Sequence, residues 1–535
     1  MAPETPDTSS PTPPSPDDAR SVARAPHPAG VVRVCVVFAA LGLAAALPYV
    51  IPAELVSGLG VSRSHLDRLK AWRDGSPIPF TRFLDFRPPT RPRIAGVPER
   101  RTETPPDDSA LLAAAQLPQP TRLPEAAPLT RGESRLRIAP EEYAGLTELI
   151  EDPAGDMAHF NDALADVARE RPGAVARVLV YSDSINGSDR LTTNLRAMFS
   201  DRFGDAGKGW VPIRPGWQYQ RHHDVVWEHG GSFRVRVVNR GEDASGRYGL
   251  GGVVAENRTP VAWATFGTVP EGPVGGSVSR FALFYQAWPE GGSVELEVDG
   301  GPAQRVSLSA AAVEDRVHEV LVPDGAHELS LRVAEGKARL YGVVMEREGP
   351  GVVVDGLMLV GAFTRVLLNF DEAHWARQLA LREPDLIAFW LGGNDSVSDS
   401  VPFVRSRFLE DFPEVLRRAR AGRPEASCLV LSAIDSAESV DGVVRSRRRV
   451  PEVVDAQREA ASLAGCAFWN AYEAIGGSGT MRRWFHASPR LVTVDYRHPT
   501  PEGARVVATL LYKALLRGYD ERLSASAPGA PPDAP

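Results

Sequence analysis

The stretch VLVYSDSINGSDRLTTNLRAMF, residues 178–199, decides the fold of this chain. It begins with a continuous apolar run, which is typical of a strand covered on both faces. It ends with apolar side chains at helical spacing from Leu191 to Phe199, and Ser188 or Asp189 suits the N-cap of such a helix. A polar turn with one acid and two hydroxyls separates the two parts. The stretch therefore predicts a buried strand that passes into a helix through a polar turn.

The alternation of strands and helices returns after residue 350. Apolar runs predict strands at residues 386–391, 428–434 and 466–472. Amphipathic spacing predicts helices at residues 160–170, 374–381, 408–421, 453–463 and 501–516. Strands that alternate with helices usually form one mostly parallel sheet with helices on both faces. We therefore expect an α/β domain built from two parts, residues 138–212 and 349–520.

The segment between these parts, residues 213–348, has a different pattern. Short alternating runs such as FRVRVV, RFALFYQAW and HELSLRV are separated by Gly, Pro and Asp turns, and helical spacing is absent. Many short strands joined by such turns are typical of an antiparallel β-sandwich. The sequence therefore predicts a β-sandwich inserted into the α/β domain.

The N-terminal region contains an apolar segment between polar stretches. Residues 1–30 are rich in Pro, Ser, Thr and Asp and are expected to be a disordered tail. Residues 31–52 contain an uncharged run long enough for one membrane-spanning helix, with arginines on its N-terminal side. We expect a signal anchor here, with a cleaved signal peptide as the open alternative, followed by a Pro-rich linker at 53–137. Residues 521–535 are expected to be a disordered C-terminal tail.

The overall charge narrows the function classes. The formal net charge is −8, and no Lys/Arg-rich block or zinc-type Cys/His spacing appears. Nucleic-acid binding is therefore not expected. Cys428 and Cys466 each lie beside a predicted strand, and the sequence leaves open whether they form a disulfide or stay two buried thiols.

Polar residues lie at three places between predicted elements, after a strand or before a helix. Ser184 follows the strand of the quoted stretch, and Asn394 and Asp395 follow the strand at 386–391. Asp495 and His498 precede the last helix. Ligands of open α/β sheets bind at the carboxyl ends of the strands. Taken singly, these residues are ordinary caps and turns. A serine, a histidine and an acid are together the groups needed for acyl transfer.

In this order and context, the residues resemble the motifs of the SGNH, or GDSL-type, hydrolases. Ser182-Asp183-Ser184-Ile185 is similar to the Gly-Asp-Ser-Leu block of that family, and Asp495-x-x-His498 is similar to its last block. The resemblance implies a flavodoxin-like, three-layer α/β fold. It also implies that Ser184 is the nucleophile, His498 the base and Asp495 the residue that orients the base.

The resemblance also implies an oxyanion hole. Residues 355–364 are similar to the second block and Gly392-x-Asn394-Asp395 to the third, so the implied donors are the N–H groups of Ser184 and Gly361 and the side chain of Asn394. Asp183 and Asp395 are expected to support these residues. Two positions depart from the family pattern: Ser182 and Met358 each stand where glycine is usual.

An inserted β-domain narrows the resemblance to exported peptidoglycan O-acetylesterases, whose inserted module is similar to carbohydrate-binding modules. Six aromatic side chains are candidates for stacking on sugar rings, although core packing is the commoner role of such residues: Trp217, Tyr219, Trp227, Trp263, Tyr285 and Trp288. We expect His222 and His223 at the surface and Trp375 in the core.

These observations predict a membrane-anchored serine esterase, in the periplasm or at the cell surface, that removes acetyl groups from a cell-envelope glycan. No metal or organic cofactor is implied, because a serine nucleophile needs only a base and an oxyanion hole. Two alternatives remain: an O-acetyltransferase with the same three residues, and a catalytically inactive glycan-binding protein. The sequence does not specify the glycan, the acyl group or the oligomeric state.

Overall fold

The computed structural model describes residues 135–259, 261–397 and 403–525. The expected N-terminal tail, the signal anchor and residues 526–535 lie outside these ranges, as does the linker up to residue 134. Within the described ranges, no helix is long and apolar enough to cross a membrane. The end of the expected linker already packs on the folded part, since Arg135 is buried and pairs with Glu170 at 3.2 Å.

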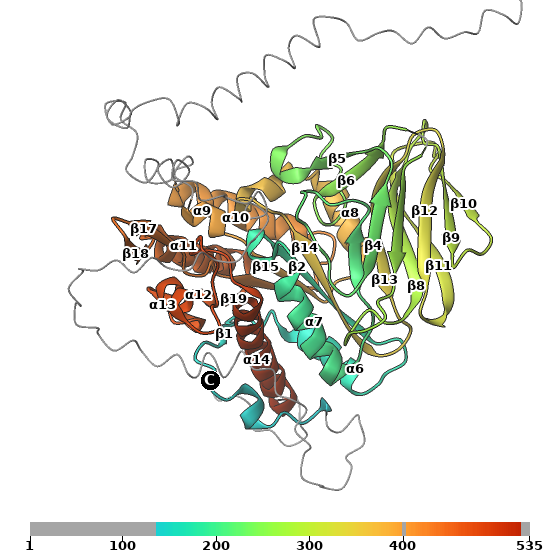
Figure 1. Ribbon diagram of the computed structural model, residues 1–535. Coiled ribbons are helices and arrows are strands. Elements are labelled where there is room, and N and C mark those ends of the chain that lie inside the picture. The colour runs from blue at the N-terminus through green and yellow to red at the C-terminus, as the bar shows by residue number, and fades with distance from the viewer. Residues whose placement is uncertain (1–134, 260, 398–402, 526–535) are drawn as a thin grey trace, which may run out of the picture. The chain divides into compact units, whose positions relative to one another are not determined.

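The central element is a mixed six-stranded sheet in the order β1-β19-β16-β15-β2-β14 (Figure 1). Five strands run parallel, and β1 is antiparallel at one edge. The bounds are β1 Ile150–Glu151, β2 Val175–Ser182, β14 Gly351–Met358, β15 Leu386–Trp390, β16 Ser427–Leu431 and β19 Ala467–Trp469. The prediction of an α/β domain with a mostly parallel sheet is confirmed.

Helices cover both faces of this sheet, because alternate residues of β2 belong to two separate cores. Val178 and Val180 pack with residues of α6, α7 and α14, whereas Leu179 and Tyr181 pack with residues of α8, α10 and α11. Figure 1 shows the first group of helices on one side of the sheet and α10 and α11 on the other. The bounds are α6 Ala158–Ala168, α7 Arg190–Phe203, α8 Glu372–Arg382, α10 Arg405–Arg420, α11 Arg449–Ala464 and α14 Pro501–Ala525. Trp375 is fully buried in the second core, as predicted.

The last helix is longer than the sequence predicts. α14 continues to Ala525, so the expectation of a disordered tail is wrong for residues 521–525. Two contacts hold the extension on the domain: the ring of Tyr519 packs on Phe203 at 5.5 Å, and Arg522 pairs with Asp162 at 2.8 Å. The apolar periodicity weakens beyond residue 516, which is why the sequence alone suggested an earlier end.

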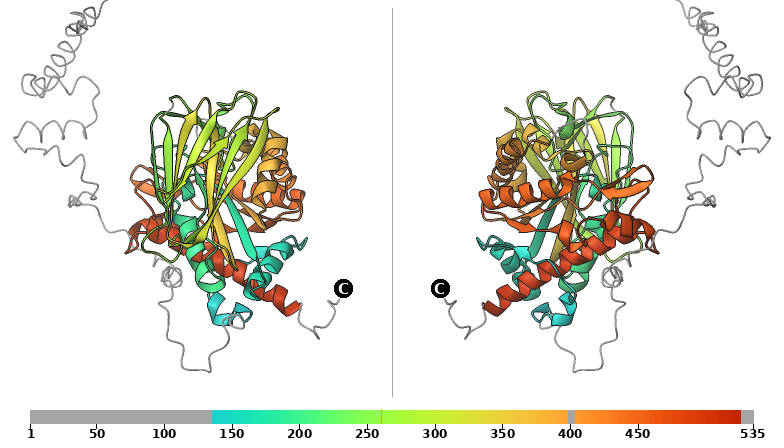
Figure 2. Two further views of the ribbon diagram at one scale, coloured as in Figure 1. Left: turned by 90° about the vertical axis from the view of Figure 1, so that its right-hand side faces the viewer. Right: turned by 90° about the vertical axis from the view of Figure 1, so that its left-hand side faces the viewer.

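Two further antiparallel sheets follow the first part of the α/β domain (Figure 2). Their orders are β10-β9-β12-β7-β4 and β11-β8-β13-β6-β5, with β3 pairing with β13. The bounds are β3 Gly209–Pro212, β4 Val226–Gly230, β5 Phe233–Val237, β6 Val253–Asn257, β7 Trp263–Gly267, β8 Val278–Ala287, β9 Ser293–Val298, β10 Gln304–Ser307, β11 Glu314–Gly325, β12 Glu328–Glu335 and β13 Arg339–Glu346. Apolar residues of both sheets, such as Phe266 and Phe281, share one buried core.

These sheets also pack on the α/β domain. Trp210, Phe284 and Tyr341 belong to the same core as Leu357 of β14. The first of these strands, β3, starts before residue 213, so the chain enters the antiparallel sheets a few residues earlier than expected. Because the two parts share a core, removal of the antiparallel sheets would expose apolar surface of the α/β domain.

Shorter elements complete the described chain. These are the helices α9 Gly393–Val397, α12 Ala471–Ala474 and α13 Thr480–His486, the hairpin β17 Ala437–Val440 with β18 Val443–Ser446, and the 3₁₀ turns η2 Pro140–Tyr143, η3 Ser184–Asn186, η4 Val238–Arg240 and η5 Thr364–Asn369.

The sequence left open whether the two cysteines outside the N-terminal region pair. Cys428 and Cys466 form a disulfide, because β16 and β19 are neighbours with Leu429 opposite Ala467.

Candidate active site

The polar turn after β2 presents Ser184 at the carboxyl end of the sheet. Ser184 is the first residue of η3, and Asp183 caps this turn by accepting the N–H of Ile185 at 3.0 Å. The side chain of Asn186 then accepts the N–H of Leu191 at 3.0 Å at the start of α7. Asp189 occupies the N-cap position of α7, but its side chain makes no capping bond.

The loop before α14 brings His498 to Ser184. Asp495 Oδ2 accepts the Nδ1–H of His498 at 2.6 Å, and the Ser184 hydroxyl donates to His498 Nε2 at 2.8 Å. Burial alone would raise the pKa of Asp495. Hydrogen bonds from His498 and Thr493 outweigh burial and hold this pKa well below its usual range. The predicted serine, histidine and acid therefore form one hydrogen-bonded chain, with an ionised carboxylate that fixes the tautomer of the imidazole.

The expected oxyanion donors lie on adjacent turns. The turns after β2 and β14 are held together by the N–H of Leu359, which donates to the Ser182 carbonyl at 2.8 Å. Gly361 lies in the second turn with φ +78°, where a side chain would be strained. No described group accepts a hydrogen bond from the N–H of Ser184 or Gly361. Two such unpaired donors beside a nucleophile suit the binding of an oxyanion.

Asn394 lies between these turns. Its Nδ2 donates to the Ala362 carbonyl at 2.9 Å and lies 3.4 Å from Asp183 Oδ2. The long contact to Asp183 leaves one N–H of the amide weakly bonded, and this N–H is the group available to an oxyanion. The two residues that depart from the family pattern, Ser182 and Met358, are both buried, and the Ser182 hydroxyl has no partner among the described residues.

Two buried carboxyls support this arrangement. Burial raises the pKa of Asp183, although the hydrogen bond from Ile185 opposes the shift. Burial also raises the pKa of Asp395 to about 6, against the opposing hydrogen bonds from the backbone and hydroxyl of Thr364. Asp395 accepts both Thr364 bonds at 3.1 Å and so anchors η5 to the short helix α9, which carries Asn394.

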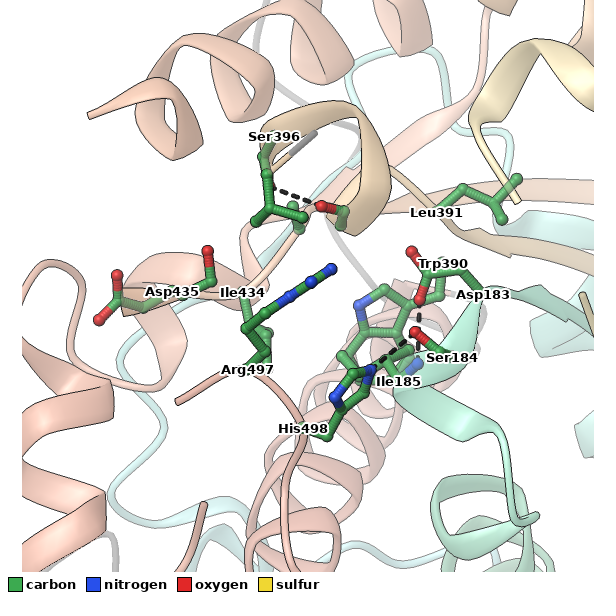
Figure 3. Close-up of a pocket in the computed structure, with 14 residues that line it drawn as sticks. Asp183, Ser184, Ile185, Trp390, Leu391, Ser396, Ile434, Asp435, Arg497 and His498 are labelled. Carbon is green, nitrogen blue, oxygen red and sulfur yellow. Dashed lines mark hydrogen bonds between the residues drawn. The ribbon is translucent and has the colours of Figure 1, made fainter. Parts of the chain in front are cut away.

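A hollow opens beside Ser184 and His498 (Figure 3). It encloses about 410 Å³ including its mouth. Its walls combine apolar side chains with a few polar ones: Ile185, Trp390, Leu391, Val397 and Ile434 on the apolar side, and Asp183, Ser396, Asp435, Ser436 and Arg497 on the polar side. Most of this volume is the open mouth, and only about 30 Å³ of it is cavity space, so the hollow is a shallow cleft beside the nucleophile.

A cluster of buried charges lies behind the Ser184 turn. Asp189 pairs with Arg196 at 3.3 Å and with Lys208 at 2.9 Å, and Arg196 also pairs with Asp224. Burial would raise the pKa of Asp189, but the charges of Arg196 and Lys208 hold it far below its usual range. The sequence does not indicate this cluster, because its members lie on different elements and follow no motif.

One of the two histidines expected at the surface is buried. His222 is fully buried beside Asp189, with Nδ1 4.0 Å from the carboxylate, so the expectation of a surface position is wrong for it. Burial lowers its pKa to about 3 and keeps it neutral. His223 is exposed as expected, although its backbone N–H donates to Asp189 at 3.1 Å.

The six candidate aromatic residues divide by burial. Tyr285 and Trp288 are buried in the core, Trp217 and Trp227 are half-buried, and Tyr219 and Trp263 are exposed. The rings of Trp217 and Tyr219 meet edge to face at 5.9 Å. Trp217 also packs against Gly187, where an added Cβ would lie 3.1 Å from the indole ring. This aromatic pair therefore borders the turn that carries Ser184. Among the described residues, no group of three or more His, Cys, Asp or Glu side chains could hold a metal ion.

Part of this chain is similar to a known protein family, and its fold is similar to that of a solved structure. The GDSL-like Lipase/Acylhydrolase family matches residues 334–506, which include Gly361, Asn394, Asp495 and His498 but not Ser184. No curated protein sequence matches the chain. A solved structure described as "Peptidoglycan O-acetylesterase in action" aligns over 70% of this chain and 99% of its own, with 21% identity and a TM-score of 0.59.

Two carbohydrate esterases also align. One is a family two carbohydrate esterase from Cellvibrio japonicus, with 13% identity over 56% of this chain and 99% of its own. The other is a carbohydrate esterase family 2 enzyme of Corynascus thermopiles (Myceliophthora fergusii), with 14% identity over 53% of this chain and 99% of its own. Their TM-scores of 0.23 and 0.24 are too low for a comparison of folds. The family match over residues 334–506 shows that this part of the chain is similar to GDSL-like acylhydrolases, and together with the contact of Ser184 with His498 it supports a carboxylic ester hydrolase.

Proposed function

We propose that this chain removes O-acetyl groups from a cell-envelope glycan through an acetyl-Ser184 intermediate. One observation carries the proposal: the Ser184 hydroxyl donates to His498 Nε2 at 2.8 Å while Nδ1–H is held by Asp495 at 2.6 Å. This geometry prepares the hydroxyl to lose its proton to a base that is already in the correct tautomer. In this proposal Ser184, His498 and Asp495 are the catalytic residues.

The reaction proceeds in two halves. Ser184 Oγ attacks the acetyl carbonyl carbon while its proton passes to His498 Nε2. The resulting oxyanion faces the N–H groups of Ser184 and Gly361 and the amide of Asn394. Collapse breaks the bond to the sugar oxygen, which takes the proton from His498. Water then attacks the acetyl-serine with His498 as base, and acetate leaves as Ser184 Oγ regains its proton.

The glycan part of the proposal has separate support. The solved structure that aligns over most of this chain is described as a peptidoglycan O-acetylesterase. The two antiparallel sheets with a shared core resemble the expected sandwich, and the half-buried Trp217 with the exposed Tyr219 offers a ring face beside the site. Aromatic faces of this kind suit the apolar face of a sugar ring. In this proposal the hollow beside Ser184 holds the acetyl group, and the rings of Trp217 and Tyr219 hold the polymer.

Hydrolysis and transfer differ in the acceptor that reaches the acetyl-serine. With an acetyl donor and an excess of unacetylated glycan fragments, we expect free acetate to form much faster than acetylated fragments, because the hollow opens to solvent and admits water. Acetate assay and mass spectrometry of the fragments measure the two products. Accumulation of acetyl groups on the glycan ahead of acetate release would overturn the esterase proposal in favour of a transferase.

We also propose that residues 31–52 anchor the chain in a membrane, with the hydrolase domain in the periplasm or at the cell surface. The uncharged run in the sequence and the Cys428–Cys466 disulfide support this, because disulfides persist in oxidising compartments. The full chain is expected in the membrane fraction, and a chain that starts at residue 53 in the soluble fraction. Equal distribution of the two chains after fractionation would contradict the anchor.

A further inference from the structure

The residue before the catalytic histidine, Arg497, sends its side chain into the hollow beside Ser184. Its guanidinium extends into the space between Ser396 and Trp390 (Figure 3), and all three residues line the same hollow. The side chain is half-buried. The turn that holds His498 also fixes the backbone of Arg497, so the side chain starts directly beside the base.

Within the described ranges, the Arg497 guanidinium has neither a hydrogen bond nor an ion pair. The fully buried arginines of the domain behave differently: Arg196 pairs with Asp189 and Asp224, and Arg382 pairs with Glu346 and Asp355. A partly desolvated cation without a partner is costly, and an anion that enters the hollow would remove this cost.

The local fold does not use this side chain. The backbone N–H of Arg497 donates to Asp495 Oδ1 at 3.0 Å, and the N–H of His498 donates to the same oxygen at 3.2 Å. These bonds shape the Asp495–His498 turn without the guanidinium. Asp183 also lines the hollow and feels the charge of Arg497, but its carboxylate is bonded to Ile185 and contacts Asn394, and it forms no ion pair with Arg497.

A second group in the hollow also lacks a partner. Ser436 lines the hollow, only 6% of its surface is exposed, and its buried hydroxyl has no hydrogen-bond partner among the described residues. A buried hydroxyl without a partner is unfavourable, so a substrate group that reached it would gain a hydrogen bond. The hydroxyl and the guanidinium are both donors, which is the combination that binds a carboxylate or phosphate.

We propose that Arg497 and Ser436 bind an anionic group of the substrate, a carboxylate or a phosphate, carried by the glycan close to the acetylated hydroxyl. This rests on the proposed esterase function and narrows its substrate to acidic acetylated glycans. Arg497 is then a specificity-determining residue: it orients the sugar, and it takes no part in bond formation at the ester.

The test compares matched acetylated sugars that differ in one anionic group. The acidic probes are O-acetylated methyl glucuronoside, O-acetylated N-acetylmuramic acid and O-acetylated glucose 6-phosphate; the neutral probes are the two corresponding carboxamides and O-acetylated glucose. The chain should prefer at least one acidic probe, and Arg497→Gln should lower kcat/KM for that probe by about 10- to 100-fold, mainly through KM. The neutral probes should change less than about 2-fold. The preferred probe shows whether the anion is a ring carboxylate, a lactyl carboxylate or a phosphate.

Arg445→Gln is the matched control. Arg445 is exposed on β18 and does not line the hollow, so its loss should leave the preference for acidic probes intact. Arg497→Lys keeps the charge and should retain part of the preference, with a stronger dependence on salt. Equal effects of Arg497→Gln on acidic and neutral probes, or no preference in the unmodified chain, would refute the proposal.

A binding experiment separates this proposal from the esterase proposal. In a Ser184→Ala background, unacetylated methyl glucuronoside, N-acetylmuramic acid and glucose 6-phosphate are titrated by calorimetry with and without Arg497→Gln. Binding of an acidic sugar that Arg497→Gln abolishes supports the anion site even if no acetyl ester is cleaved. If no acidic sugar binds more tightly than its neutral counterpart, the anion site is wrong whatever the esterase activity.

Discussion

Ser184→Ala and His498→Ala should each lower kcat for acetyl ester hydrolysis by about 10³-fold or more, with little change in the free energy of unfolding. The removed atoms are the nucleophile and the base of the hydrogen-bonded chain, and both side chains lie at the mouth of the hollow rather than in a core. The initial rate of acetate release measures the first effect, and urea unfolding measures the second.

Two comparisons make this result specific. Ser188→Ala removes a hydroxyl from the same turn, four residues further along, and should keep nearly full activity because Ser188 does not line the hollow. Asp495→Asn should lose less activity than His498→Ala, because the base itself remains, although an amide no longer fixes its tautomer. Near-normal turnover by Ser184→Ala would show that the assigned nucleophile is wrong.

The parts of the structure that follow from local sequence patterns were predicted well. The buried strand, the turn with Ser184 and α7 all lie within one continuous stretch, so their order and spacing are visible in the sequence. The block with Asn394 and the pair Asp495 and His498 are equally short. Because carboxyl ends of parallel strands share one edge of a sheet, placing these motifs on predicted strands brings them together.

The features that were missed depend on contacts between distant residues. The contacts of α7 with Lys208, His222 and Asp224 depend on how the antiparallel sheets pack on the domain. Nothing near these residues in the sequence indicates a buried charge. The role of Arg497 could not be predicted for another reason. In the pattern Asp-x-x-His it occupies a variable position, and only its place in the hollow without a partner distinguishes it from a surface arginine.

The buried charge cluster should matter greatly for stability. Asp189→Asn is expected to lower the free energy of unfolding by about 3–5 kcal/mol, because it leaves Lys208 buried without an anionic partner and removes one of the two anions beside Arg196. Asparagine is similar in size and tolerates the φ of +58° found at this position, so the substitution tests the charge rather than the backbone. Urea unfolding at pH 7 measures the difference.

The pH dependence gives this prediction a second readout. The pKa of Asp189 in the folded chain lies far below the value near 3.9 of an unfolded chain, so its stabilising effect is present above about pH 4 and is lost as the pH falls further. The gap between the unmodified chain and Asp189→Asn should therefore narrow below about pH 4. A gap that stays constant down to pH 2 would mean that the substitution acts through packing rather than through the charge.

Glu414→Gln is the control for Asp189→Asn. Glu414 pairs with Arg417 and Arg418 at 2.7 Å each, so it loses as many ion pairs as Asp189, but these pairs lie on the solvent side of α10. Such pairs contribute less than about 1 kcal/mol. Asp189→Asn should also lower kcat, because its carboxylate holds the helix that follows the Ser184 turn, whereas Glu414→Gln should leave kcat unchanged. If both variants lose stability equally, burial of the cluster behind the nucleophile contributes nothing beyond an ordinary surface pair.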